Sequence, residues 1–65
     1  MAKDFKPWTQ QDEQDLRDSY ESGSGIVDIA RDMGKTPLSV IARLARLGSI
    51  YPHQAVAMSK QFTRQ

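Results

Sequence analysis

Two glycines and a Thr-Pro pair divide the middle of this 65-residue chain into two segments. The first segment ends at Gly34, and the second begins at Thr36-Pro37 and ends at Gly48. Glycine readily takes the left-handed conformation that closes a helix, threonine caps a helix start, and proline fits the first helical position. The pattern therefore predicts one helix ending at Met33 and a second over 36–47, separated by a short turn.

Apolar side chains recur at helical spacing on both sides of that turn and also nearer the N-terminus. A first helix is predicted between Thr9, whose hydroxyl would form a capping box with Asp12, and Ser22-Gly23. Ser24 is the expected cap of the next helix. The predicted core consists of Phe5 or Trp8, Leu16, Tyr20, Ile26, Ile29, Met33, Val40, Leu44 and Leu47, and Ala30 lies on the same apolar stripe as Ile26, Ile29 and Met33.

Two helices joined by a three- or four-residue turn that contains glycine are typical of a helix-turn-helix. The expected fold is all-α, a three-helix bundle with a helix-turn-helix over residues 7–50, preceded by an arm over 1–6. In the tail, 51–65, three apolar residues at i, i+3 and i+7 allow a short fourth helix, with a frayed terminus as the alternative. These residues are Ala55, Met58 and Phe62.

Charge is distributed unevenly along the chain. Residues 1–32 hold eight acids and four bases, a net charge of −4, whereas residues 33–65 hold five bases and no acid, a net charge of +5. Such asymmetry indicates a face for a polyanion and an opposite face that keeps the domain solvated. Chance clustering of surface charge is the alternative.

Several classes of function are disfavoured by the composition. The chain has no cysteine and one histidine, His53, so no metal site or cofactor is expected. The acids of the first predicted helix suit its dipole and do not form a catalytic set, and we expect no enzyme activity. No apolar run is long enough to cross a membrane, and the first residues lack the apolar core of a signal peptide. A cytoplasmic protein is expected, associated with the nucleoid if it binds DNA.

Short sequence pieces then follow one another in a recognisable order. They are Pro7-Trp8-Thr9 before acids, Leu16, Tyr20, Gly23, Ile29-Ala30, Met33-Gly34-Lys35-Thr36, Val40-Ile41, Arg43-Leu44 and Arg46-Leu47-Gly48. In order and spacing they resemble the Myb/SANT-like helix-turn-helix domains over residues 7–50. The short bacterial and phage versions, including the N-terminal domain of GcrA-type cell-cycle regulators, are most similar. The resemblance implies a three-helix bundle in which Trp8 fills the core and the third helix faces DNA.

The expected function is therefore double-stranded DNA binding by a small transcriptional regulator, with helix 36–47 in the major groove. Phosphates would be held by basic and hydroxyl side chains and the helix N-terminus, and bases by the few side chains that reach them. Because few polar side chains on this helix could reach base edges, we expect modest sequence specificity, or specificity supplied by a homodimer or a partner. The candidate DNA-binding residues are Lys35, Thr36, Leu38, Ser39, Ala42, Arg43 and Arg46.

The same helix also suits a different class of function. Its outward side is more apolar than groove reading requires, and an apolar patch with a charged rim is typical of a protein contact. The alternative is a protein-interaction module of a phage or plasmid that binds a host protein such as RNA polymerase or a regulator. Its candidate residues are Leu38, Ile41, Ala42 and Ala45.

Overall fold

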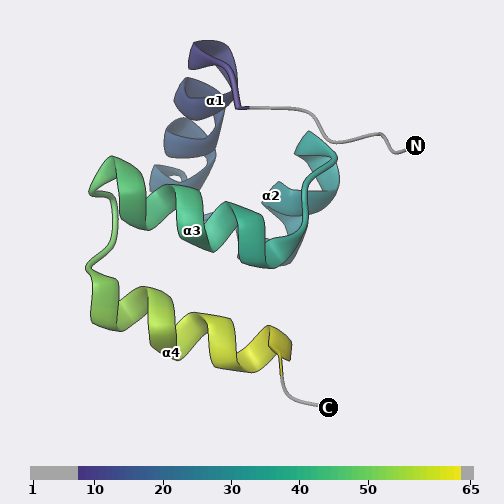
Figure 1. The fold of residues 1–65 in the computed structure, drawn as a ribbon. Coiled ribbons are helices and arrows are strands. Elements are labelled where there is room, and N and C mark those ends of the chain that lie inside the picture. The colour runs from purple at the N-terminus through teal and green to yellow at the C-terminus, as the bar shows by residue number, and fades with distance from the viewer. Residues whose placement is uncertain (1–7, 64–65) are drawn as a thin grey trace.

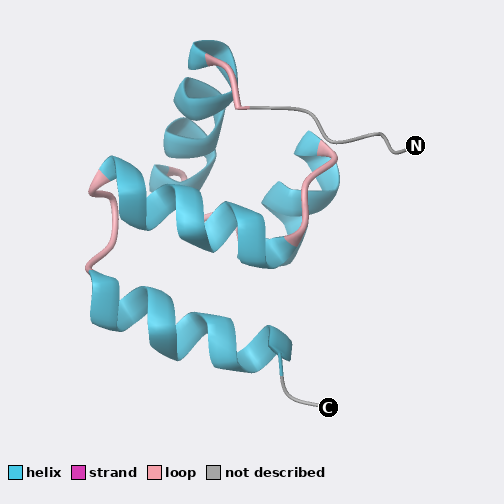
Figure 2. Cartoon of the chain, viewed as in Figure 1, coloured by secondary structure: helices cyan, strands magenta, loops and turns pink. Residues whose placement is uncertain are grey.

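The computed structural model describes residues 8–63, and within that range the secondary structure is entirely helical (Figures 1 and 2). The expected all-α class is confirmed. The arm over 1–6 and the alternative core residue Phe5 lie outside the described residues. The elements are α1 (Gln10–Glu21), α2 (Ile26–Met33), α3 (Pro37–Leu47) and α4 (Pro52–Thr63).

The starts of α1 and α3 are capped as the sequence predicts. The Asp12 backbone N–H donates to the Thr9 hydroxyl oxygen at 3.0 Å, and the Thr9 N–H donates to the Asp12 carboxylate at 3.2 Å. These reciprocal bonds are a capping box, which satisfies two amides that have no partner within the helix. At α3 the Thr36 hydroxyl oxygen accepts from the Ser39 N–H at 3.1 Å, with Pro37 at the first helical position.

Left-handed glycines end α2 and α3. Gly34 has φ 69° and Gly48 has φ 82°, a region that side chains with a Cβ rarely adopt. The next N–H then turns back onto the helix, from Lys35 to the Ala30 carbonyl and from Ser49 to the Leu44 carbonyl, both at 2.9 Å. This is the Schellman arrangement, which closes each helix sharply.

The predicted cap of α2 is wrong. The residue at the N-cap position is Gly25, and no side chain caps this helix. The Ser24 N–H donates instead to the Ser19 carbonyl at 3.1 Å, so Ser24 completes the closing turn of α1. Because Ser24 completes the end of α1, the start of α2 falls one residue later.

The core lies where the inward sides of α1, α2 and α3 meet. Its buried members are Leu16, Ile29, Ala30, Val40, Ile41, Leu44 and Ile50, and Trp8, Tyr20, Ile26, Met33 and Leu47 pack against them. The predicted core is thereby confirmed for the described residues. Ile41 and Ile50 are the members that the helical pattern did not assign to it.

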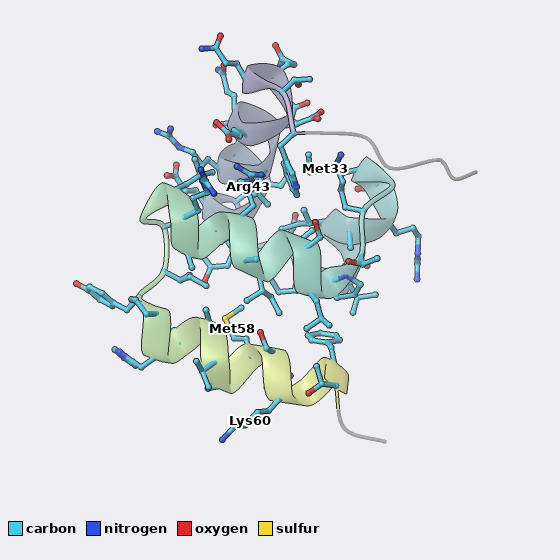
Figure 3. The ribbon with its side chains drawn as sticks, viewed as in Figure 1. Met33, Arg43, Met58 and Lys60 are labelled. Atoms are coloured by element: carbon cyan, nitrogen blue, oxygen red, sulfur yellow. The ribbon has the colours of Figure 1, made fainter. Side chains whose placement is uncertain are left out.

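The fourth helix is present and packs against α3. Figure 1 shows α4 turning back beside α3, on the side away from α1 and α2. Ala55, Met58 and Phe62 face the core, and in Figure 3 Met58 lies between the two helices while Lys60 points away from them. The alternative of a frayed tail is therefore wrong for residues 52–63. The start of α4 is tied by the Tyr51 N–H, which donates to the Gln54 side chain at 2.8 Å.

Candidate functional site

The outward side of α3 carries a narrow exposed stripe formed by Leu38, Ala42 and Arg46. These residues are spaced at i, i+4 and i+8, so they lie one above the other along the helix. Leu38 is 39 % exposed, and the turn formed by Gly34, Lys35 and Thr36 leads directly into its N-terminal end. A ligand that lies along this stripe would therefore meet one positively charged side chain, Arg46, and two apolar ones, Leu38 and Ala42.

The apolar patch predicted for a protein partner is smaller than the sequence indicates. Ile41 is 0 % exposed and belongs to the core, so its assignment to a partner-binding surface is wrong. Ala45 is half-buried and packs against the same core. The physical reason is that α3 lies between α1 and α2 on one side and α4 on the other, and therefore buries two flanks instead of one. Leu38 and Ala42 are the members of the patch that remain exposed.

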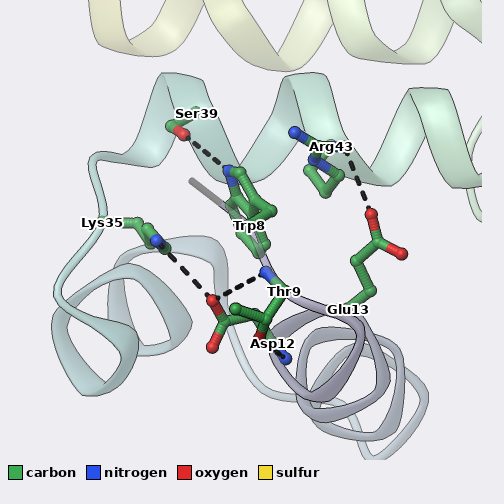
Figure 4. Close-up of polar contacts among 7 residues, drawn as sticks. All are labelled: Trp8, Thr9, Asp12, Glu13, Lys35, Ser39 and Arg43. Atoms are coloured by element: carbon green, nitrogen blue, oxygen red, sulfur yellow. Dashed lines mark hydrogen bonds and ion pairs between the residues drawn. The ribbon is translucent and has the colours of Figure 1, made fainter. Parts of the chain in front are cut away.

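Trp8 connects the start of α1 to α3 (Figure 4). Its indole N–H donates to the Ser39 hydroxyl oxygen at 3.4 Å. The Lys35 ammonium lies 4.9 Å and the Arg43 guanidinium 5.2 Å from the centre of the Trp8 ring, within the range of a cation–π contact. One aromatic side chain thus fixes the positions of three predicted DNA-binding residues.

Two acids of α1 complete this cluster. The Glu13 carboxylate accepts from the Arg43 guanidinium at 3.2 Å, and the Asp12 carboxylate lies 3.8 Å from the Lys35 ammonium. The Lys35 side chain is 10 % exposed and that of Arg43 is 24 % exposed. Ion pairs this close to the surface contribute only about 0–1 kcal/mol each, but they neutralise charge locally. The positive charges of Lys35 and Arg43, which were predicted to bind a polyanion, are therefore partly neutralised by acids of α1.

Arg46 differs from the other basic residues at this end of α3. It is exposed, and within residues 8–63 no acidic side chain forms an ion pair with it. Thr36 is exposed as well, but its hydroxyl oxygen is occupied as the cap of α3. Among the predicted DNA-binding residues, Arg46 is thus the cation that is most available to a ligand.

An open surface depression of about 440 Å³ lies between Trp8 and the outward side of α3. Its walls bring together hydroxyl, guanidinium and aromatic groups beside two small apolar side chains. The lining residues are Trp8, Ser39, Ala42, Arg43, Ala45 and Arg46. Four of them are among the predicted DNA-binding residues, so the structure groups these four around one surface feature.

Trp8, Asp12 and Glu13 are the members of this site that the sequence did not assign to it. Trp8 was expected in the core, and it does pack there, but it also forms a wall of the depression. Asp12 and Glu13 were expected to be solvated acids of the first helical turn. The signal available in the sequence was the acidic start of the first helix and the basic third helix. A pair such as Glu13 and Arg43, 30 residues apart, is defined only by tertiary packing.

Residues 8–63 contain no group of three or more histidine or acidic side chains arranged to hold a metal ion. In the same part of the chain no helix has the length and apolar character needed to cross a membrane.

Comparisons of the chain with protein-family models, with curated proteins and with solved structures gave no match. The resemblance to Myb/SANT-like domains therefore stays a prediction from the residues.

Proposed function

We propose that the chain is a helix-turn-helix protein that binds double-stranded DNA through the exposed stripe of α3 and regulates transcription. The observation that carries this proposal is the unit formed by α2, a three-residue turn and α3, whose second helix is free of acids and exposes Arg46 beside Leu38 and Ala42. A helix presented in this way is suited to the major groove. This activity would place the protein in the cytoplasm, on the nucleoid.

The roles of the side chains follow from their exposure. Arg46 and the exposed part of Arg43 would contact phosphates or a guanine edge, and Leu38 and Ala42 would contact thymine methyl groups. Because Arg46 is the one exposed polar side chain of this stripe that could contact a base, sequence discrimination would be modest for a monomer. A homodimer reading two half-sites would raise it.

The burial of Ile41 and the partial burial of Ala45 disfavour the protein-docking alternative. A pair of exposed apolar residues, Leu38 and Ala42, is small for a protein interface but suits contacts in a groove. DNA is therefore the partner that we propose.

Replacing Arg46 with alanine tests the proposal directly. We expect Arg46→Ala to weaken binding to a mixed duplex of about 20 base pairs by roughly fivefold, and to reduce the slope of log affinity against log salt by about 0.9. The measurement is fluorescence anisotropy between about 50 and 200 mM salt. Arg46 makes no ion pair among the described residues, so the substitution should leave the fold intact.

Lys60→Ala is the matched control, because it removes one exposed positive charge from the side of α4 that faces away from α3. Its affinity should remain close to that of the wild-type chain. Equal losses in the two variants would indicate attraction by net charge alone, and undetectable binding by the wild-type chain at low salt would refute the proposed function.

Replacing Glu13 with glutamine should have the opposite effect. Because Glu13 compensates Arg43 at 3.2 Å, we expect Glu13→Gln to tighten DNA binding by about two- to fivefold at low salt, with the gain shrinking as salt rises. Glu21→Gln, at the other end of α1, is the control for the change in net charge. A loss of affinity specific to Glu13→Gln would mean that the carboxylate is needed to position Arg43.

A further inference from the structure

The depression beside Trp8 contains the Ser39 hydroxyl group, whose hydrogen has no acceptor within the part of the chain that the structure describes. The Ser39 oxygen accepts from the Trp8 indole N–H, and its backbone N–H donates to the Thr36 cap. Among residues 8–63 no group accepts the Ser39 hydroxyl hydrogen. Because the indole occupies one lone pair of the oxygen, the remaining O–H is available to donate to a ligand in the depression.

Two guanidinium groups line the same depression. Arg43 uses an N–H for Glu13 and keeps further N–H donors, since a guanidinium carries five. Its contact with the Trp8 ring restricts its motion before any ligand arrives, which lowers the entropy lost on binding. Arg46 supplies the second guanidinium from the exposed stripe.

The remaining lining residues determine the size and charge of the ligand. Ala42 and Ala45 are small and leave the depression open, and among residues 8–63 no acidic side chain lines it. With a volume of about 440 Å³ open to solvent, the depression has room for a phosphate group. Convergent N–H and O–H donors without an acid are suited to a phosphate, because a phosphate offers only acceptors to them.

We infer that this depression is an anion site that takes one backbone phosphate of duplex DNA, with Ser39, Arg43 and Arg46 as donors and Trp8 as the residue that orients the Ser39 hydroxyl. The inference rests on the proposed function and assigns its principal phosphate contact. It places that contact at the edge of α3 beside Trp8. Because Trp8 lies just before α1, the start of α1 would then help to determine the orientation of α3 on DNA.

Trp8 is the single tryptophan of the chain, so its emission reports on this site. We expect the wild-type chain to change its tryptophan emission on titration with the duplex at micromolar concentration, and with inorganic phosphate only at millimolar concentration. Ser39→Ala should weaken duplex binding about tenfold, as expected for loss of a hydrogen bond to a charged group. Ser24→Ala, an exposed serine outside the depression, is the matched control.

Ser39→Asp makes the test independent of folding defects. Residue 39 is the third residue of α3, where a carboxylate is favourable for the helix dipole, so this variant should keep its helix content. In the depression the same carboxylate would repel a phosphate, and we expect duplex binding to fall at least thirtyfold. Circular dichroism is the measurement that checks whether the variant is folded.

The outcomes separate the inference from the proposed function. If Ser39→Ala and Ser39→Asp bind duplex as tightly as Ser24→Ala while Arg46→Ala does not, the anion site is refuted and DNA binding stands. If inorganic phosphate saturates the emission change at micromolar concentration, a free anion and not the DNA backbone is the ligand. If the wild-type chain binds no duplex, both the proposed function and the anion site are refuted.

Discussion

Replacing Ile41 with aspartate is expected to unfold the domain. Ile41 is 0 % exposed and belongs to the core, so the variant would place a carboxylate where no buried polar partner is present among the described residues. An unpaired buried charge costs several kcal/mol, and the whole stability of a small domain is about 5–15 kcal/mol or less. The helical signal in circular dichroism at 25 °C should be largely lost.

Leu38→Asp is the matched control on the same helix. Leu38 is 39 % exposed and is the second residue of α3, where an acid is compatible with the helix dipole. Its free energy of unfolding should therefore change by only about 0.5 kcal/mol. A folded Ile41→Asp would contradict the burial of this flank, and an unfolded Leu38→Asp would contradict the exposure of the stripe.

Trp8→Ala is expected to cause the second-largest loss of stability. It removes an indole that packs against the core. The same indole, just before α1, also contacts Ser39, Lys35 and Arg43 in and before α3. Truncating a fully buried aromatic residue costs about 3–5 kcal/mol, and because Trp8 is half-buried we expect about 2–4 kcal/mol. For a domain of this size the Tm should fall by roughly 10–20 °C, measured by thermal unfolding.

Trp8→Phe separates the ring from its N–H group. Phenylalanine keeps an aromatic face for the two cations and most of the packing, so its stability should lie well above that of Trp8→Ala. It lacks the donor to Ser39, and DNA affinity should fall while the fold persists. A Trp8→Ala variant as stable as the wild-type chain would show that the indole does not hold the start of α1 against α3.

The helix boundaries could be predicted because the signals for them are local. A threonine cap, a proline at the first helical position and a left-handed glycine each act within one turn of chain, and α3 begins and ends where Thr36, Pro37 and Gly48 indicate. The inward stripes of α1, α2 and α3 were predictable for the same reason. Ser24 shows the limit of such reasoning. Its position suits either the cap of α2 or the closing turn of α1, and in the structure its N–H bonds to the end of α1.

The second buried flank of α3 could not be predicted, because it depends on where α4 packs. The helical pattern of α3 alone leaves Ile41 at the boundary of the inward stripe, whereas in the structure α3 packs against α4 as well as α1 and α2, and Ile41 belongs to the core. Ile50 lies in the connection between α3 and α4, which has no helical periodicity, and is 5 % exposed. The sequence shows the charge asymmetry between the two halves of the chain. The ion pair of Glu13 with Arg43 could not be predicted from it, because that pair depends on how α1 packs against α3.

The three connections between the helices are only three or four residues long, and each helix packs against a neighbour in sequence. Chains dominated by such local contacts fold in microseconds to milliseconds, because little loop entropy is lost before the contacts form. The contacts between α1 and α3 are long-range, and those of Trp8 and Glu13 with α3 span 31 and 30 residues. We therefore expect the helices to assemble first and the surface beside Trp8 to be completed last.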